Sequence, residues 1–231
     1  MRNRMSDQLF TKVHQQFPRQ TVADLEPTVT RQLHSGKLHF ARGARIAIAV
    51  GSRGVANLAR IAQTVVAAVK AQGGEPFIVP AMGSHGGATS DGQRDVLASY
   101  GVTETAMGCP IRSAMDVVEL DNSGLEFPVF MDRHAFESDG VILINRVKPH
   151  TGFHGTYESG LVKMSVIGLG KQRMAETMHG YGVHGLKNLM PQACGRILAS
   201  GKILLGLGLV ENAYDETALI EALTPEEILR R

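Results

Sequence analysis

Three short apolar runs, each followed by a loop rich in glycine or basic residues, constrain the fold of this chain more than any other feature. RIAIAV at 45–50 leads into GSRG, EPFIVPAM at 75–82 into GSHGG, and DGVILIN at 139–145 into RVKPH. Between the first two runs, residues 55–72 place apolar side chains at helical spacing and end at a Gly-Gly pair. Strands that alternate with helices predict an α/β fold, with a mostly parallel, Rossmann-like sheet flanked by helices.

Shorter elements complete this pattern. Thr89, Ser90 or Asp91 can cap a helix that carries Leu97 and Tyr100. Two segments, 115–120 and 127–130, flank a turn and predict a hairpin. We also expect one or two surface helices in the polar opening, a helix near 186–200 and a strand over 202–209.

The C-terminal residues TPEEILRR predict the start of a helix. Thr224 is suited to be the N-cap, Pro225 the first helical residue, and Glu227 the partner of the cap in a capping box. The chain stops before this helix completes two turns. We therefore expect a truncated chain that forms the front part of a longer protein.

Charge and composition exclude several classes of protein. Lys and Arg number 24 and Asp and Glu 22, and a net charge of +2 provides no large basic field for nucleic acid. Aromatic residues make up only 5% and Trp is absent, which argues against a base-stacking platform or an aromatic sugar-binding cleft. We therefore predict no nucleic-acid partner.

Cysteine usage and the N-terminal sequence indicate a cytoplasmic setting. Cys109 and Cys194 lie far apart and belong to no CxxC motif, so neither a disulfide framework nor a thiolate zinc site is indicated. The polar N-terminus has no apolar core typical of a signal peptide, and no later apolar run is long enough to span a bilayer. We expect no export signal and no membrane anchor.

The three loops that follow the apolar runs carry the candidate binding residues. The carboxyl ends of parallel strands meet at one edge of a sheet, so these loops are expected to converge. Arg53, in a glycine turn before a helix, is suited to hold a carboxylate or phosphate. The motif GxxxxGK[ST] is absent and GxGxxG is incomplete, which disfavours a P-loop or a nicotinamide site. The polar residues of the three loops are Ser52, Arg53, Ser84, His85, Arg146, Lys148 and His150.

Two histidines and one lysine are candidates for chemistry. His85 and His150, on different loops, can act as acid and base on opposite faces of a substrate, or each can simply hydrogen-bond its own loop. Lys163 stands among apolar residues, where a lysine can lose its charge and form a covalent link, or can extend its ammonium group to solvent. The other histidines match no helix-borne zinc motif, and a zinc-dependent hydrolase stays open as an alternative.

The ordered motifs GSRG, PAMGSHGGAT, PHTGFHG, SGLVKM and MHGYG resemble the N-terminal domain of the nickel-dependent lactate racemase family, over residues 45–185. The resemblance implies a protein of two α/β domains with the active site between them. Residues 1–231 would be the N-terminal domain, and the C-terminal domain would be absent from this chain. The resemblance also implies a nickel pincer nucleotide derived from nicotinic acid and tethered to Lys163 by a thioamide bond, with His179 as the nickel ligand.

The same resemblance implies roles for the loop residues. His85 and His150 resemble the two catalytic histidines, and Arg53 resembles the arginine that anchors the substrate or cofactor. Ser52 and Lys148 are expected to contact the cofactor. The implied activity is racemisation or epimerisation of a 2-hydroxy acid, or a sugar-acid relative, by hydride transfer to and from the cofactor. The implied partners are this small-molecule substrate and the enzymes of cofactor maturation, and a homo-oligomer is compatible with the sequence.

Two features depart from the family pattern and leave the identity of the hydroxy acid open. The segment 150–163 is longer than we expect for a lactate enzyme and adds His154 and Glu158. Val50 stands where an acidic residue is typical of the family. An alternative function is that of a noncatalytic α/β module that binds an anionic small molecule or nucleotide.

Overall fold

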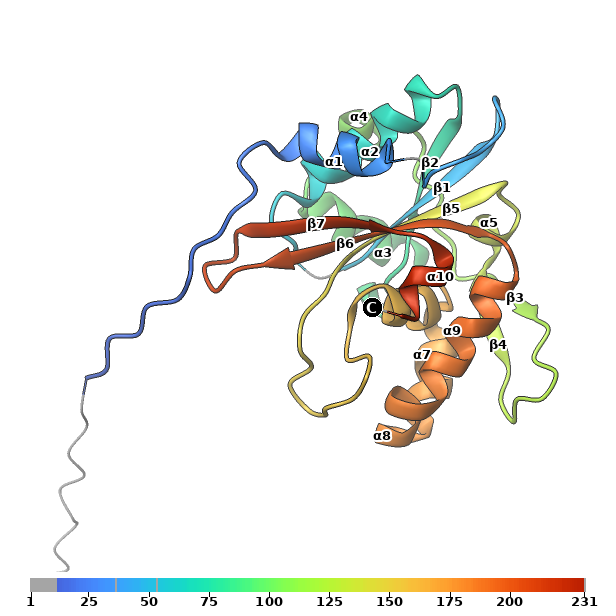
Figure 1. Ribbon diagram of the computed structural model, residues 1–231. Coiled ribbons are helices and arrows are strands. Elements are labelled where there is room, and N and C mark those ends of the chain that lie inside the picture. Colours follow the sequence, from blue (N-terminus) through green and yellow to red (C-terminus); the bar gives the residue numbers. More distant parts are fainter. Residues whose placement is uncertain (1–11, 36, 53, 231) are drawn as a thin grey trace, which may run out of the picture.

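A five-stranded sheet forms the centre of the protein in the computed structural model, which describes residues 12–35, 37–52 and 54–230. The strands lie in the order β2, β1, β5, β6, β7 (Figure 1). The first four of these are parallel, and β7 runs antiparallel to β6. This arrangement confirms the predicted mostly parallel α/β fold. The bounds are β1 Arg45–Val50, β2 Glu75–Pro80, β5 Gly140–Arg146, β6 Ile203–Glu211 and β7 Thr217–Leu223.

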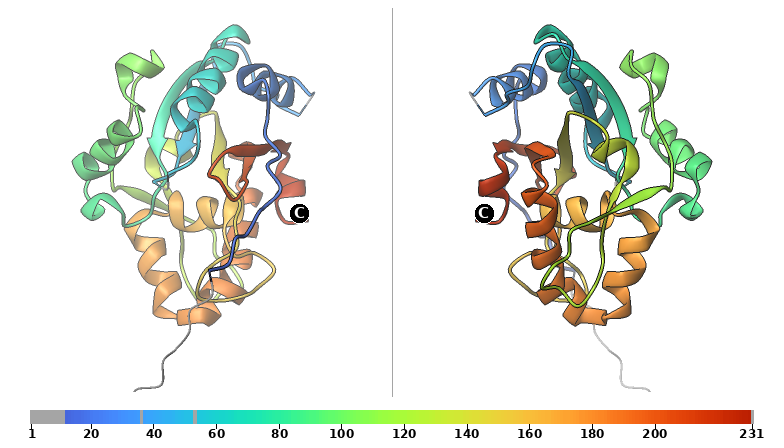
Figure 2. Two further views of the ribbon diagram at one scale, coloured as in Figure 1. Left: turned by 90° about the vertical axis from the view of Figure 1, so that its left-hand side faces the viewer. Right: turned by 90° about the vertical axis from the view of Figure 1, so that its right-hand side faces the viewer.

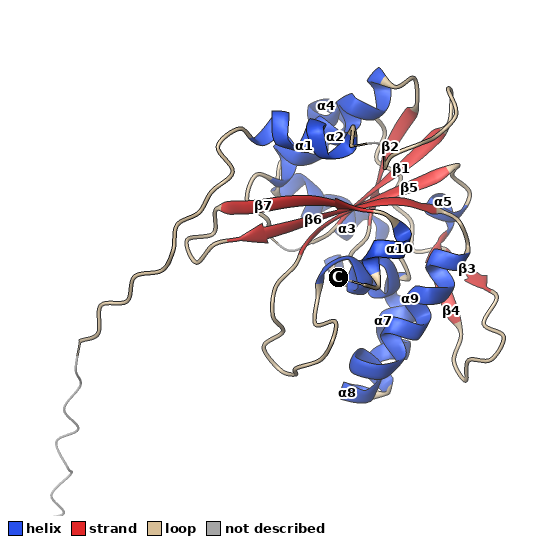
Figure 3. Ribbon diagram, in the orientation of Figure 1, coloured by secondary structure: helices blue, strands red, loops and turns tan. Residues whose placement is uncertain are grey.

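The sheet separates two hydrophobic cores, because successive side chains of a strand point to opposite faces. Ile48 of β1 packs in one cluster with helices α1 and α2, whereas Ala49 belongs to the cluster that contains α7 and α9. Figures 2 and 3 show helices on both faces of the sheet. Strands covered on both faces read as continuous apolar runs, which is why β1 was visible in the sequence. These helices are α1 Leu25–Leu33, α2 Leu58–Ala71, α7 Lys171–Gly180 and α9 Met190–Ala199.

Shorter elements connect these units. The predicted hairpin is present as the antiparallel pair β3 and β4, and Thr89 caps α3 by accepting a hydrogen bond from the backbone N–H of Gly92. Two π-helical turns, η2 and η3, interrupt the helical region between β5 and β6. The bounds are η1 Gly86–Ala88, α3 Ser90–Ser99, α4 Glu104–Met107, β3 Val117–Leu120, β4 Val129–Asp132, α5 Arg133–Phe136, α6 Gly160–Lys163, η2 Met164–Gly168, α8 Gly182–His184, η3 Gly185–Leu189 and α10 Pro225–Ile228.

Both ends of the chain contain elements that the sequence predicts. The capping box of Thr224 and Glu227 is confirmed at the start of α10. The polar opening contributes one helix, α1, within the described residues. Residues 12–22 run without helix, and residues 17–22 lie beside the β6–β7 hairpin. The spacing of polar residues in the sequence cannot distinguish a helix from an irregular segment that is held by side-chain contacts, such as the ion pair of Arg19 with Glu216. No helix among the described residues is long and apolar enough to cross a membrane.

Candidate functional site

A cavity opens at the carboxyl ends of β1, β2 and β5, where the three loops meet. These strands are adjacent and parallel, so their register brings the residues that follow them to one edge. Helical residues between β5 and β6 close the other side of the cavity. Arg53 lies outside the described residues. The polar residues that line the cavity include Ser52, Ser84, His85, Asn145, Arg146, Lys148, His150, Ser159, Lys163 and His179.

His85 is held by a loop whose shape depends on glycine. A Cβ atom at Gly86, where φ is +64°, would lie 2.5 Å from the backbone carbon of Gly92. The Oγ of Ser52 is hydrogen-bonded to Nδ1 of His85, and Tyr100 donates its hydroxyl to the backbone oxygen of Ser52 at 2.9 Å. Ser52, predicted to contact the cofactor, therefore lies against the imidazole of His85. This contact fixes one edge of the ring.

His150 lies on a loop that a carboxylate organises. The Oε2 of Glu158 accepts a hydrogen bond from the backbone N–H of His150 at 2.7 Å, and its Oε1 accepts one from Gly155 at 3.0 Å. These backbone donors, followed by a contact with His154, hold the pKa of Glu158 below its usual value. The ring of His150 packs on Phe153 with centroids 4.4 Å apart. Glu158, which the sequence analysis expected to be an addition to the family pattern, thus helps to shape the His150 loop.

Lys163 and His179 reach the same cavity from helices. Lys163 is half-buried at the end of α6, directly before the π-helical turn η2, and the adjacent Val162 and Met164 are buried as its apolar sequence context suggested. His179 is exposed in the last turn of α7. Lys148 is also exposed, and its backbone N–H donates to Ser159 Oγ at 2.8 Å.

The described residues contain no group of three or more His, Cys, Asp or Glu side chains that could hold a metal ion. The zinc-hydrolase alternative therefore gains no ligand set from this part of the chain. His154 is 92% exposed and paired with Glu158, and His184 is exposed on α8. Neither lines the cavity.

A buried ionic cluster beneath the cavity was not anticipated from the sequence. Lys171 and Asp132 are both fully buried, with Nζ 3.1 Å from Oδ2. Lys171 also donates to the backbone oxygen of Pro80 at 2.5 Å and to Gln93 Oε1 at 3.0 Å. Burial raises the pKa of Asp132 and lowers the pKa of Lys171, because a low-dielectric interior disfavours both charges.

This cluster supports the His85 loop. The Nε2 of Gln93 donates to the backbone oxygen of Gly83 at 2.8 Å and to that of His85 at 3.3 Å. Lys171 itself adopts a φ of +54°, a conformation uncommon for residues other than glycine. The only signal in the sequence was a lysine that follows GLG, and nothing local indicates that it is buried.

The fold and the cavity define an α/β protein with a cavity, lined by basic side chains, at the carboxyl edge of a parallel sheet. Over residues 12–188 the chain matches the lactate racemase N-terminal domain family, and it belongs to that family of enzymes. It is similar to the structure of the lactate racemase apoprotein from Thermoanaerobacterium thermosaccharolyticum, with a TM-score of 0.64 and 14% identity. The similarity covers 89% of this chain and 53% of the other, so this chain spans about half the length of that protein. The similarity shows that the two chains share a fold. No curated protein matches the chain.

Proposed function

We propose that this chain carries the cofactor-binding and acid–base residues of a racemase or epimerase that acts on a 2-hydroxy acid or a sugar-acid relative. The observation that carries the proposal is that His85, His150, Lys163 and His179 line one cavity in a member of this family. The proposed cofactor is a nickel pincer nucleotide, inserted by maturation enzymes in the cytoplasm. Arg53 is proposed to anchor the substrate or the cofactor.

The residues present fit such a cofactor. Lys163 offers an amine for a thioamide tether, and His179 offers an imidazole nitrogen to nickel, both on the wall of the cavity. Gly168 and Ala81 both line the cavity and approach each other closely, since a Cβ atom at position 168 would lie 2.8 Å from the backbone oxygen of Ala81. When bound, the pincer nucleotide would supply the group that accepts the substrate's Cα hydride and returns it. Lys148 and Ser52 lie on loops that would face it.

The two catalytic histidines are held differently, and this suggests different roles. The Nδ1 of His150 accepts a hydrogen bond from the backbone N–H of Gly152 at 3.0 Å, so the neutral ring carries its proton on Nε2. The Nδ1 of His85 faces the hydroxyl of Ser52, which can either accept or donate. In the tautomer with Nδ1–H donated to Ser52, Nε2 of His85 is basic and can take the proton of the substrate hydroxyl. His150 would then donate a hydrogen bond from Nε2 to a substrate oxygen, and the protonated His85 would return its proton when the hydride returns. For His150 to act as the base in the opposite direction, the hydrogen bond from Gly152 to its Nδ1 would have to open, so that Nδ1 could carry the proton and Nε2 accept one.

The mass of the intact protein and its nickel content test the cofactor. The chain is co-expressed with a pincer-nucleotide maturation system, and we expect an added mass on Lys163 together with nickel. Lys163→Ala should abolish the added mass, whereas Lys187→Ala, which removes an exposed lysine outside the cavity, should keep it. His179→Ala should lose nickel and keep the organic part. An added mass that survives in Lys163→Ala refutes the tether.

A noncatalytic module that binds an anionic molecule is the second candidate. The observation that favours it is the basic lining, since no Asp or Glu among the described residues lines the cavity. This candidate would be favoured if Lys163 acquires no cofactor in the chain alone and none when the chain is joined to a C-terminal half like that of the longer lactate racemase.

A further inference from the structure

The protein uses only part of the hydrogen-bonding capacity of Arg146, a cation in the wall of the cavity. Its side chain is 18% exposed. A guanidinium carries five N–H donors. Within the part of the chain that the structure describes, this one donates a hydrogen bond to the Oε2 of Glu211, and its Nε is buried without an acceptor. A buried donor without an acceptor is costly. The part of the side chain that remains exposed lines the cavity, where the guanidinium can bind an acceptor from a ligand.

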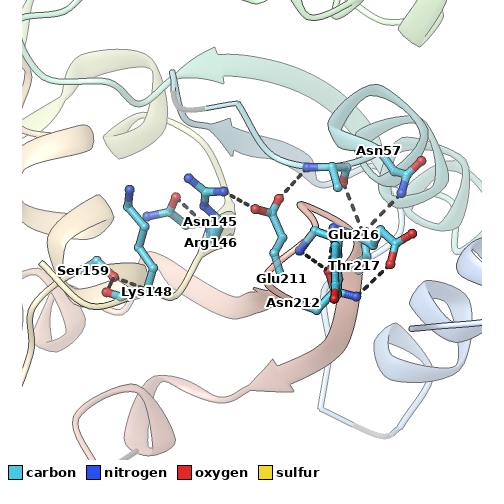
Figure 4. A network of polar contacts seen from close by, with 11 residues as sticks. Asn57, Asn145, Arg146, Lys148, Ser159, Glu211, Asn212, Glu216 and Thr217 are labelled. Atoms are coloured by element: carbon cyan, nitrogen blue, oxygen red, sulfur yellow. Dashed lines mark hydrogen bonds and ion pairs between the residues drawn. The ribbon is translucent and has the colours of Figure 1, made fainter. Parts of the chain in front are cut away.

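Glu211 fixes the position of this guanidinium. Its side chain is 6% exposed, and its Oε1 accepts a hydrogen bond from the backbone N–H of Ala56 at 2.6 Å (Figure 4). The pairing of β6 with β7 shifts register between Val210 and Glu211, an irregularity that commonly redirects side chains beside functional sites. Thr217 donates to the backbone oxygen of Ala56 at 3.4 Å, so both polar backbone groups of this residue are held. Both oxygens of the carboxylate are therefore hydrogen-bonded, one to Ala56 and one to Arg146, and Glu211 orients the guanidinium.

Charge and geometry define what such an arginine would bind. No acidic side chain among the described residues lines the cavity, and the planar fork of arginine matches carboxylate and phosphate oxygens. Lys148 lies two residues further along the same loop but is exposed, so it is more strongly hydrated and less well fixed.

We propose that Arg146, oriented by Glu211, forms an anion subsite of the cavity that takes a carboxylate or phosphate group. This inference rests on the proposed function for the identity of the anion, because both a 2-hydroxy acid and a pincer nucleotide carry such a group. Arg146 would bind the anion directly, and Glu211 would be a positioning residue.

Nuclear magnetic resonance of the 231-residue protein, labelled with nitrogen-15 at arginine, tests the subsite. The Nε–H resonance of Arg146, assigned by its loss in Arg146→Gln, should shift saturably when inorganic phosphate or L-lactate is added. Arg146→Gln should weaken the affinity for the active probe by about tenfold or more. A response to phosphate alone identifies the phosphate of the nucleotide as the occupant, and a response to lactate alone identifies the substrate carboxylate.

Two variants control for general charge and for folding. Lys187→Gln removes one positive charge from an exposed position outside the cavity and should change the affinity much less than Arg146→Gln. The double variant Arg146→Gln/Glu211→Gln removes both charges, leaves no carboxylate stranded, and should fold without binding the probe. An equal loss of affinity in Lys187→Gln and Arg146→Gln overturns the subsite, as does the lack of a saturable shift in the wild-type protein.

Neither probe requires nickel or attachment to Lys163. Binding that depends on Arg146 in a chain that acquires no cofactor, either alone or joined to a C-terminal half, would therefore refute the proposed function and keep the subsite. A chain that acquires the cofactor on Lys163 but binds both probes equally well after Arg146→Gln would keep the function and refute the subsite.

Discussion

Replacing Lys171 should destabilise the protein far more than replacing a typical lysine. Its ammonium group lies 3.1 Å from Asp132 and donates to Pro80 and Gln93, and neither charged side chain has exposed surface. Removal of one partner of a buried ion pair costs about 3–5 kcal/mol, because the remaining charge is left uncompensated. We therefore expect Lys171→Met to lower the free energy of unfolding by roughly that amount. Met has a similar length, so the loss of volume is small.

Urea denaturation followed by circular dichroism measures this loss against a matched control. Arg60 pairs with Glu26 at 2.7 Å, but the two side chains are 57% and 46% exposed. An exposed pair of this kind is worth about 0.2–1 kcal/mol, so Arg60→Met should cost no more than that. If both variants lose the same free energy of unfolding with unchanged urea dependence, the buried pair does not stabilise the structure more than an exposed pair does.

A second variant separates stranded charge from lost packing. Asn at position 132 can still accept the hydrogen bond that Asp132 Oδ1 receives from the backbone N–H of Ala135 at 2.9 Å. Lys171→Met/Asp132→Asn should therefore be more stable than Lys171→Met, since no buried carboxylate remains. If the double variant is no more stable than Lys171→Met, the loss of unfolding free energy is due to packing and not to the buried charge.

Three further predictions concern the loops and the cysteines. Glu158→Ala should speed hydrogen exchange at the amide of His150, and Glu158→Gln should do so less. In the wild-type protein this protection should be present above the ordinary pKa of 4.5 and be lost as the pH falls through the lowered pKa of Glu158. Gly86→Ala should lower the free energy of unfolding more than Gly87→Ala does. Both glycines have positive φ, where an alanine is strained by about 1–2 kcal/mol. Only at position 86 would the added Cβ atom also clash with backbone atoms. Cys194 is fully buried, and burial raises its pKa to about 11. A thiol reagent should therefore label it only when the protein unfolds. Rapid labelling of the native protein would contradict this prediction.

The parallel part of the fold was predictable because its signal is local. Buried parallel strands such as β1 are apolar along most of their length and end at glycine, so their position needs no knowledge of neighbours. The edge strand β7, TALIEAL, was not predicted. Its burial is mixed, and the same letters suit a helix or a strand until pairing with β6 decides between them. Helix α7 was missed for a similar reason, since its sequence KQRMAETMHG contains few apolar residues and begins with a residue of positive φ.

The meeting of the three loops followed from topology, whereas most contacts within the cavity did not. Adjacent parallel strands bring their carboxyl ends together whatever the side chains are, so His85 and His150 could be assigned to one edge from the sequence. The contact of Ser52 with His85, and that of Glu158 with the His150 loop, depend on loop conformations that sequence spacing does not determine. The roles of these histidines in catalysis remain predictions that turnover measurements must test.

An ionisable side chain makes hydrogen bonds that hold each loop of the cavity. Lys171 binds the end of β2 and, through Gln93, the His85 loop. Glu211 binds the loop after β1, and Glu158 binds backbone groups of its own loop, which follows β5. Loops lack the regular hydrogen bonds of helices and sheets, so their buried backbone groups need partners from side chains. A charged partner forms a stronger hydrogen bond than a neutral one, and it is stable in a half-buried position only when most of its hydrogen bonds are made. The loops can therefore be rich in glycine and still hold their side chains in fixed positions, as the proposed placement of two imidazoles around one substrate would require.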